Sequence, residues 1–170
     1  MDTTSWRLVE SLLAEQRFAV LATQGGGAPY TSLVAFAVTP DLRRIRFPTR
    51  AGTQKFANLE AEPRVALLVD NRSNSADDYR NAAAVTAIGS VRLEGGPEAD
   101  DHRSLLLARH PMLADFLASA DCHIASVTVA HYLLVTRFEA VVRLDPSGCR
   151  RRVRCPQHQE PHNEPRRLPP

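Results

Sequence analysis

The chain has 170 residues, which is enough for one domain with a single core. Apolar residues make up 44% and aromatic residues 6%, and the formal net charge is +2. Residues 1–147 carry 15 basic and 17 acidic side chains, whereas the last 23 residues carry six arginines against two glutamates. The body of the chain therefore lacks the basic surface of a nucleic-acid-binding domain, and a few tail arginines without stacking aromatics predict only weak, salt-sensitive attraction.

Targeting signals are not evident. No apolar run approaches the length of a membrane span, and the N-terminus lacks the basic-then-apolar layout of a signal peptide. The three cysteines are an odd number, which suits a reducing compartment better than a disulfide framework. We therefore expect a cytoplasmic protein.

The N-terminal third is predicted to be a helix followed by three strands. Apolar residues recur at helical spacing over residues 4–16, and a buried strand follows at 17–23. A glycine-rich turn over 25–29 leads into a second strand at 30–38, so the pair predicts a β-hairpin. A third strand is expected at 42–47.

The remaining elements alternate less regularly. A helix is predicted at 53–61, ended by Pro63, with a strand at 64–69 and a polar loop at 70–75. The later predicted elements are a strand at 82–93, helices at 100–108 and 111–119, and strands at 124–135 and 138–144. Since few helices separate the strands, an antiparallel barrel with helical decoration is favoured over a parallel nucleotide-binding sheet.

The turn before the first internal helix has the character of a phosphate site. Lys55 is the only lysine of the chain, and it follows Arg50, Gly52 and Thr53. Thr53 is a plausible N-cap, Gly52 suits a tight turn, and a helix start offers unpaired N–H groups. The alternative interpretation is an ordinary helix start with its basic residues in water.

The order of these segments resembles the pyridoxamine 5′-phosphate oxidase-like family of FMN-binding split barrels. The segments that carry the resemblance are residues 19–23, the glycine turn, 29–34, 46–49, 52–55, 58–59 and 63–69. The resemblance implies a mainly β (α+β) fold, a six-stranded antiparallel split β-barrel over residues 1–147 that works as a homodimer, with FMN where the two subunits meet. Residues 148–170, rich in arginine, proline and histidine, are expected to be a disordered tail.

The resemblance also assigns cofactor-binding residues by position. It implies that Ser32, Leu33 and Val34 line the flavin ring through their backbone. The other residues that it implies are Pro48 and Thr49 beside the ring and ribityl chain, and Thr53, Gln54 and Lys55 on the phosphate. The second strand lacks the basic residues that the oxidase uses, so Arg50 is expected to compensate.

A second polar cluster follows the strand at 64–69. Asn71 and Arg72 occupy a loop that lies near the flavin in the family, and the alternative interpretation is an ordinary exposed turn. The family's vitamer-binding Arg-x-His pair has no counterpart at residues 135–139. Oxidation of pyridoxamine phosphate itself is therefore not expected.

Histidine and cysteine residues add little to this prediction. His102 and His110 lie in helical segments and are expected to face solvent. The tail residues Cys149, Cys155, His158 and His162 only loosely imitate zinc-ligand spacing and have no apolar surroundings, so no metal site is predicted.

The function predicted from the sequence is that of an FMN-binding flavoprotein. We expect an oxidoreductase that uses a small organic substrate or reduced nicotinamide, with no catalytic residue assigned. The alternative is a non-catalytic carrier or sensor of flavin, deazaflavin or haem. Expected partners are a second copy of the chain and a small-molecule substrate, without membrane or nucleic acid.

Overall fold

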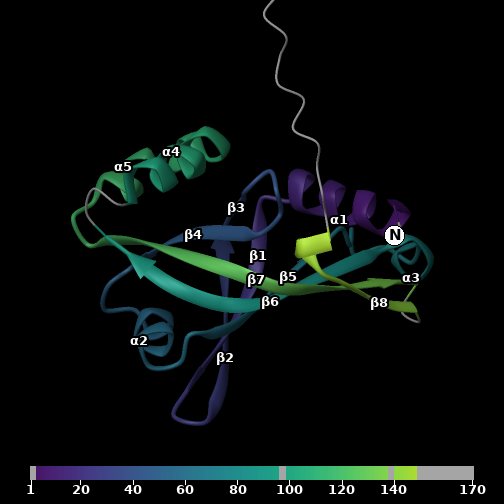
Figure 1. Cartoon of the computed structure of the whole chain (residues 1–170), viewed down its shortest axis with the longest axis horizontal. Helices are drawn as coiled ribbons and strands as arrows, with labels where there is room; N and C mark the ends of the chain where they lie inside the picture. Colours follow the sequence, from purple (N-terminus) through teal and green to yellow (C-terminus); the bar gives the residue numbers. More distant parts are fainter. Residues whose placement is uncertain (1–2, 96–98, 138–139, 149–170) are drawn as a thin grey trace, which may run out of the picture.

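One antiparallel sheet organises the chain in the computed structural model, which describes residues 3–95, 99–137 and 140–148. The described strands are β1 (Phe18–Gly25), β2 (Ala28–Ala35), β3 (Ala37–Val38), β4 (Arg44–Arg50), β5 (Arg64–Asp70), β6 (Ala83–Glu94), β7 (Cys122–Thr136) and β8 (Ala140–Leu144). The helices are α1 (Thr3–Glu15), α2 (Gln54–Ala61), α3 (Asp78–Asn81), α4 (Asp100–Arg109) and α5 (Ala114–Ala118), with short 3₁₀ turns η2 (Pro111–Leu113) and η3 (Pro146–Gly148). Figure 1 shows their arrangement.

The sheet closes on itself as a split barrel. Its main path runs in the order β2-β1-β5-β6-β7-β4-β3, so β2 and β3 are the two ends of this path, and β8 pairs with β7 beside it. These edge strands are consecutive in the chain and only Phe36 separates them, which requires the sheet to curl until its edges meet. Away from the bend at Phe36, β2 and β4 approach each other without forming a ladder. The predicted antiparallel split-barrel fold is confirmed.

The core fills the inside of the curled sheet and is covered by α1. Alternate residues of the strands point inward, for example Leu21 and Leu67, which are fully buried. Helix α1 buries one stripe on this core that includes Trp6, Val9 and Leu13.

The Arg109 side chain joins the end of α1 to the end of α4. Arg109, at the end of α4, donates from Nη2 to the carbonyls of Leu13, Ala14 and Gln16, at 2.8, 3.0 and 2.5 Å. Those carbonyls belong to the last turn of α1 and the residue after it, where helical partners are missing. Burial lowers the pKa of Arg109, with Arg17 adding to the effect.

In strand β7, the alternation of inward-pointing and outward-pointing side chains shifts by one residue part-way along the strand. Its ladder with β6 shifts between Ile88 and Gly89, so Ala130 is left without a direct partner and a β-bulge forms. Val127 and Val129 point into the core before the bulge, and Tyr132 does so after it. A Cβ on Gly89 would lie 2.2 Å from the Thr128 carbonyl oxygen, so only glycine fits opposite the bulge.

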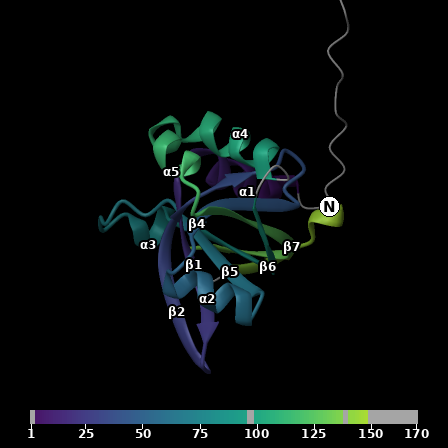
Figure 2. The ribbon, with the colours of Figure 1, turned by 90° about the vertical axis from the view of Figure 1, so that its left-hand side faces the viewer.

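Helices cover the sheet unequally. Figures 1 and 2 both place α4 and α5 together on one side and α2 on the other, beside the β1–β2 hairpin. Helices α4 and α5 bury a second, smaller cluster with Ile124 and Cys122 against β7. The outer faces of β1, β2 and β5 carry no helix in the described chain, and Phe18 and Leu33 are 54% and 67% exposed there.

Several element predictions need correction. The described sheet has eight strands, whereas the sequence predicts seven and the resemblance implies a six-stranded barrel, because the predicted strand at 30–38 breaks at Phe36 into β2 and β3. The strand predicted from Leu42 begins at Arg44, since Leu42 has a φ of 58° in the preceding turn. Helix α3 was not predicted because it has only four residues and no buried face. Except for Gly148, the predicted tail and its cysteines and histidines lie outside the described residues.

Two histidine predictions are also wrong. His110 is 6% exposed, and its Nε2 donates to the Phe36 carbonyl at 2.8 Å. His102 pairs with Glu94 and is mostly covered. Both side chains therefore support the packing of α4 on the sheet instead of facing solvent.

Candidate functional site

The split between β2 and β4 exposes backbone that a ligand can use. Strand β2 pairs only with β1, and β4 has β3 on its other edge only at Ile45 and Arg46. Extending the β3–β4 register by three residues would place Val34 opposite Thr49, but no ladder forms there. Open edges leave N–H and C=O groups available on both sides of the split.

Two hydroxyl groups point inward from these facing strands. Ser32 and Val34 share the inner face of β2, and Thr49 follows Phe47 on the inner face of β4. The Oγ of Ser32 and the Oγ1 of Thr49 are both buried, and neither has a hydrogen-bond partner in the described chain. Buried polar atoms are normally paired, so two unpaired hydroxyls on either side of one split indicate a place for a polar ligand.

The start of α2 closes one end of this split. Thr53 is the N-cap: its hydroxyl accepts from the Phe56 N–H at 3.3 Å and donates to the Arg50 carbonyl at 2.9 Å. Gly52 has a φ of 80°, which suits glycine in this turn. Lys55 is partly buried and has no ion-pair partner among the described residues. The predicted N-cap and helix start are confirmed.

Arg50 has other partners. Its Nε lies 3.7 Å from Asp121 Oδ2, and its Cζ lies 4.8 Å from the centre of the Phe116 ring. The pKa of Asp121 is lowered first by a hydrogen bond from Ser119 and further by Arg50. The guanidinium therefore faces the α5 side of the sheet, away from the inner face that carries Thr49.

The remaining residues predicted to bind the cofactor are spread over both faces. Pro48 is buried, but its side chain points to the face opposite Thr49. Leu33 is exposed on the outer face of β2. Gln54 is exposed and donates from Nε2 to Asn58 Oδ1 at 2.8 Å.

Asn58 fixes α2 to the hairpin that carries the split. It is 3% exposed, and its Nδ2 donates to Thr23 Oγ1 at 3.1 Å. The helix comes so close to β1 that a Cβ on Gly25 would lie 2.1 Å from Asn58 Oδ1. The hydrogen bond of Asn58 and the close approach that Gly25 permits therefore fix the position of helix α2 against strand β1.

Replacing Asn58 with alanine is expected to destabilise the protein by about 1–3 kcal/mol, because a buried hydrogen bond and its packing are lost. Thermal unfolding should show Tm lower by several degrees. Gly25→Ala should be harmful alone and milder in the Asn58→Ala background, where the clashing amide is gone. Equal costs of Gly25→Ala in both backgrounds would contradict this account.

Asn71 and Arg72 lie far from α2 within one chain. They follow the end of β5, whose seven residues span roughly 20 Å from its start beside α2. Asn71 Oδ1 accepts from the Ala83 N–H at 2.8 Å, and Arg72 Nε lies 3.1 Å from Asp70 Oδ1. One chain therefore does not bring these two residues together with Thr53 and Lys55.

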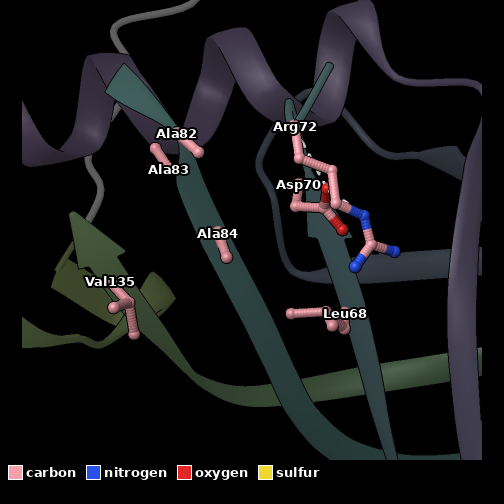
Figure 3. A pocket seen from close by; sticks show the side chains of 7 residues that line it. All are labelled: Leu68, Asp70, Arg72, Ala82, Ala83, Ala84 and Val135. Carbon is pink, nitrogen blue, oxygen red and sulfur yellow. Dashed lines mark hydrogen bonds and ion pairs between the residues drawn. The ribbon is translucent and has the colours of Figure 1, made fainter. Parts of the chain in front are cut away.

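A small hollow lies beside Arg72. Its volume is about 140 Å³, and the lining residues are Leu68, Asp70, Arg72, Ala82, Ala83, Ala84 and Val135. Figure 3 shows the Asp70–Arg72 pair at the end of β5, with the small apolar side chains around it. The hollow therefore offers an apolar floor with a charged pair at its edge.

His123 is a residue that the sequence prediction did not assign. It lies directly opposite Thr49 in the β4–β7 ladder, and its ring centre is 4.9 Å from that of Phe56 in α2. It stands some 70 residues after Thr53 at the start of α2, and no local motif marks it. Only the strand pairing reveals that an imidazole borders the split.

The model of the pyridoxamine 5′-phosphate oxidase family matches residues 6–132, which is well over half of the chain. The chain belongs to this family. No curated protein matches it. The family's sequence pattern thus covers the chain from α1 into β7, including both edges of the split and α2.

Solved structures support the same fold. A haem-binding protein from Mycobacterium smegmatis is 17% identical with a TM-score of 0.75; the match covers 86% of this chain but only 60% of that protein. An FAD-binding protein from Mesorhizobium loti is 17% identical over 77% of this chain and 91% of its own, with a TM-score of 0.62. The haem storage protein HutZ from Vibrio cholerae is 15% identical over 76% and 92%, with a TM-score of 0.65. At these identities the likeness establishes the fold alone.

Every helix in the described part of this family member is too short or too polar to traverse a lipid bilayer.

Proposed function

We propose that this member of the pyridoxamine 5′-phosphate oxidase family binds FMN in the split between β2 and β4. The observation that carries the proposal is the pair of buried hydroxyls of Ser32 and Thr49 on the two facing strands, which have no hydrogen-bond partner among the residues that the structure describes. A flavin ring and its ribityl chain offer the donors and acceptors that these groups lack. The open edges at Leu33, Val34 and Pro48 add backbone groups for the ring.

The phosphate of FMN would lie at the start of α2. The unpaired N–H groups there, the Thr53 hydroxyl and the Lys55 ammonium together suit a dianion. Gln54 lies at the same helix start and can turn toward the ligand, at the cost of its bond to Asn58. Arg50 would contribute only after leaving Asp121 and Phe116, so we assign it the smaller share.

The protein would act as a homodimer. Phe18, Leu33 and Val141 are 54%, 67% and 65% exposed on the outer face of the same sheet, where no helix of the described chain covers them. Phe18 and Leu33 lie on the neighbouring strands β1 and β2, and Val141 lies on β8. Exposed apolar side chains on an uncovered sheet face are characteristic of a subunit interface. A second copy is the partner that buries this face in the proposal.

Dimerisation would also give Asn71 and Arg72 a role. Because they lie at the other end of β5 from α2, they reach a flavin only when it belongs to the partner subunit. The hollow with Asp70 and Arg72 at its rim opens on the outer side of the sheet, next to the proposed interface (Figure 3). Each cofactor site would thus be completed by two chains.

The reaction class in this proposal is oxidation and reduction of a small organic substrate or of a reduced nicotinamide in the cytoplasm. Bound flavin supplies electron or hydride transfer. The chain's own residues bind and orient it and exclude water, and His123 beside Thr49 is the nearest candidate for holding a proton. The sequence has no vitamer-binding pair at residues 135–139, which argues against pyridoxamine phosphate as substrate.

A carrier of flavin, deazaflavin or haem is the second candidate. Haem is favoured by the names of two similar structures and by the partly buried His123, since an imidazole is a common axial ligand.

Absorbance of the purified protein tests these candidates. We expect a flavin spectrum, either as isolated or after mixing with FMN and gel filtration. A sharp Soret band would instead identify haem as the bound group. Anaerobic addition of NADH or NADPH should then bleach the flavin if the protein is a reductase. If flavin stays bound but neither NADH nor NADPH reduces it, the result would favour a flavin carrier. Failure to retain any flavin would overturn the proposal.

A further inference from the structure

A row of polar side chains crosses the sheet on the face opposite the core. Arg46 of β4 is the ladder partner of Ser126 in β7, which in turn is the partner of Arg92 in β6. Arg46 alternates with Ile45 and Phe47, which are both fully buried in the core. All three side chains of the row therefore leave the sheet on its outer face.

The next row of ladder partners on the same face also consists of an arginine and hydroxyl side chains. Arg44 is paired with Thr128, and Thr128 with Ser90. Adjacent strands lie roughly 5 Å apart and alternate residues roughly 7 Å apart, so the two rows form one patch. We call Arg44, Arg46, Arg92, Ser90, Ser126 and Thr128 the arginine–hydroxyl patch.

Two members of the patch are buried without partners. Arg46 is 8% exposed and Ser126 is 3% exposed. Neither the Nε of Arg46 nor the Oγ of Ser126 has a hydrogen-bond partner within the described ranges. Burial lowers the pKa of Arg46, and the nearby Arg44 lowers it further. An unpaired guanidinium donor and an unpaired hydroxyl side by side are costly unless a ligand satisfies them.

The charges around the patch leave a positive excess. Glu94 raises the pKa of Arg46, but it forms no hydrogen bond with Arg46 and is held by His102 from α4. Arg64, at the far end of the second row, is already bound by Glu62 through two hydrogen bonds of 2.8 and 2.6 Å. Asp41 also raises the pKa of Arg46, but its Oδ1 accepts hydrogen bonds from the Thr39 hydroxyl and the Arg43 N–H. Arg44, Arg46 and Arg92 thus face two neighbouring carboxylates, Glu94 and Asp41, both of which have other partners.

We propose that the arginine–hydroxyl patch is a second anion site, which binds the phosphate group of a small molecule between Arg46, Ser126 and Arg92. A phosphate carries nearly two negative charges and three strong acceptor oxygens, which match the positive excess and the two unpaired donors. A nucleic acid fits less well, because the patch has no aromatic side chain for stacking.

This site is separate from the one proposed for FMN. Arg46 and Thr49 leave β4 on opposite faces of the sheet, and Lys55 lies with α2 beyond the end of that strand. The inference therefore does not depend on the flavin proposal, and each can fail alone.

Arginine Nε–H resonances of the full-length ¹⁵N-labelled protein test the proposal. Inorganic phosphate and pyrophosphate are added at constant ionic strength maintained with chloride, and the Arg46 signal is assigned by its loss in Arg46→Gln. We expect saturable shifts of the Arg46 signal, and calorimetry should show affinity about tenfold or more weaker in Arg46→Gln. Ser126→Ala should weaken binding several-fold, and Arg64→Gln, whose arginine is already occupied by Glu62, should change it little.

The outcomes separate this site from its alternatives. Unchanged binding in Lys55→Ala and with saturating FMN supports a separate site, whereas loss in either case assigns the phosphate to α2 and overturns the proposal. Absence of a saturable shift at tens of millimolar phosphate also overturns it. Conversion of the dimer to monomer by Arg92→Gln would show that the patch is a subunit contact and would overturn it as well.

Discussion

Lys55→Ala is expected to raise the Kd for FMN by about ten- to hundredfold. Lys55 is the chain's only lysine, and it follows the N-cap Thr53 by two residues. Its ammonium forms no ion pair with an acidic residue in the described part of the chain. A charge-assisted hydrogen bond to a phosphate contributes about 1.5–3 kcal/mol, which corresponds to this loss of affinity. Fluorescence quenching of FMN on titration with apoprotein measures it directly.

Arg50→Ala is the matched control, five residues earlier in the same turn. Its guanidinium is about half exposed and already engaged by Asp121 and Phe116, so we expect a change in Kd within about threefold. Riboflavin, which lacks the phosphate, should bind wild type and Lys55→Ala equally well. A larger loss in Arg50→Ala than in Lys55→Ala would move the phosphate to the other face of the turn.

Leu33→Asp is expected to convert the proposed dimer to a monomer and to abolish tight binding of the proposed cofactor FMN. Leu33 is 67% exposed in the single chain, so its replacement should leave the monomer's stability within about 0.5 kcal/mol. In the proposed dimer, however, the carboxylate would be buried without a partner at the subunit contact. Light scattering after gel filtration gives the mass, and FMN titration gives the affinity.

Met112→Asp provides the comparison for that experiment. Met112 is 96% exposed, but it lies in η2 beside α4 and not on the open sheet face. It should leave both mass and FMN affinity unchanged. A wild-type protein that is monomeric at micromolar concentration, or a dimeric Leu33→Asp that keeps its flavin, would refute the proposed interface.

Local chemistry made much of the fold readable in advance. The helix start at Thr53, the end of that helix near Pro63 and the glycine turn of the first hairpin each depend on residues close in sequence. The apolar run over residues 65–69 likewise marked β5 as a strand, although the structure was needed to show which of its sides is buried. The family resemblance then supplied the split-barrel architecture, but not the order of the strands in the sheet.

Long-range packing was beyond such reasoning. The bulge at Ala130 depends on what β6 presents opposite it, and the burial of His110 depends on the Phe36 carbonyl 74 residues earlier. The role of Asn58 was missed for the same reason, because its partner Thr23 lies 35 residues away. The unpaired hydroxyls of Ser32, Thr49 and Ser126 became visible only when their surroundings were known.

The guanidinium of Arg109 has a consequence for biosynthesis. The carbonyl of Leu13 that it binds is synthesised 96 residues earlier. While most of the sheet is made, the last carbonyls of the first helix therefore have water as their partner instead of Arg109. The N-terminal segment should therefore gain full protection from hydrogen exchange only in nascent chains that extend past Arg109. Shorter nascent chains would keep this segment open to chaperones.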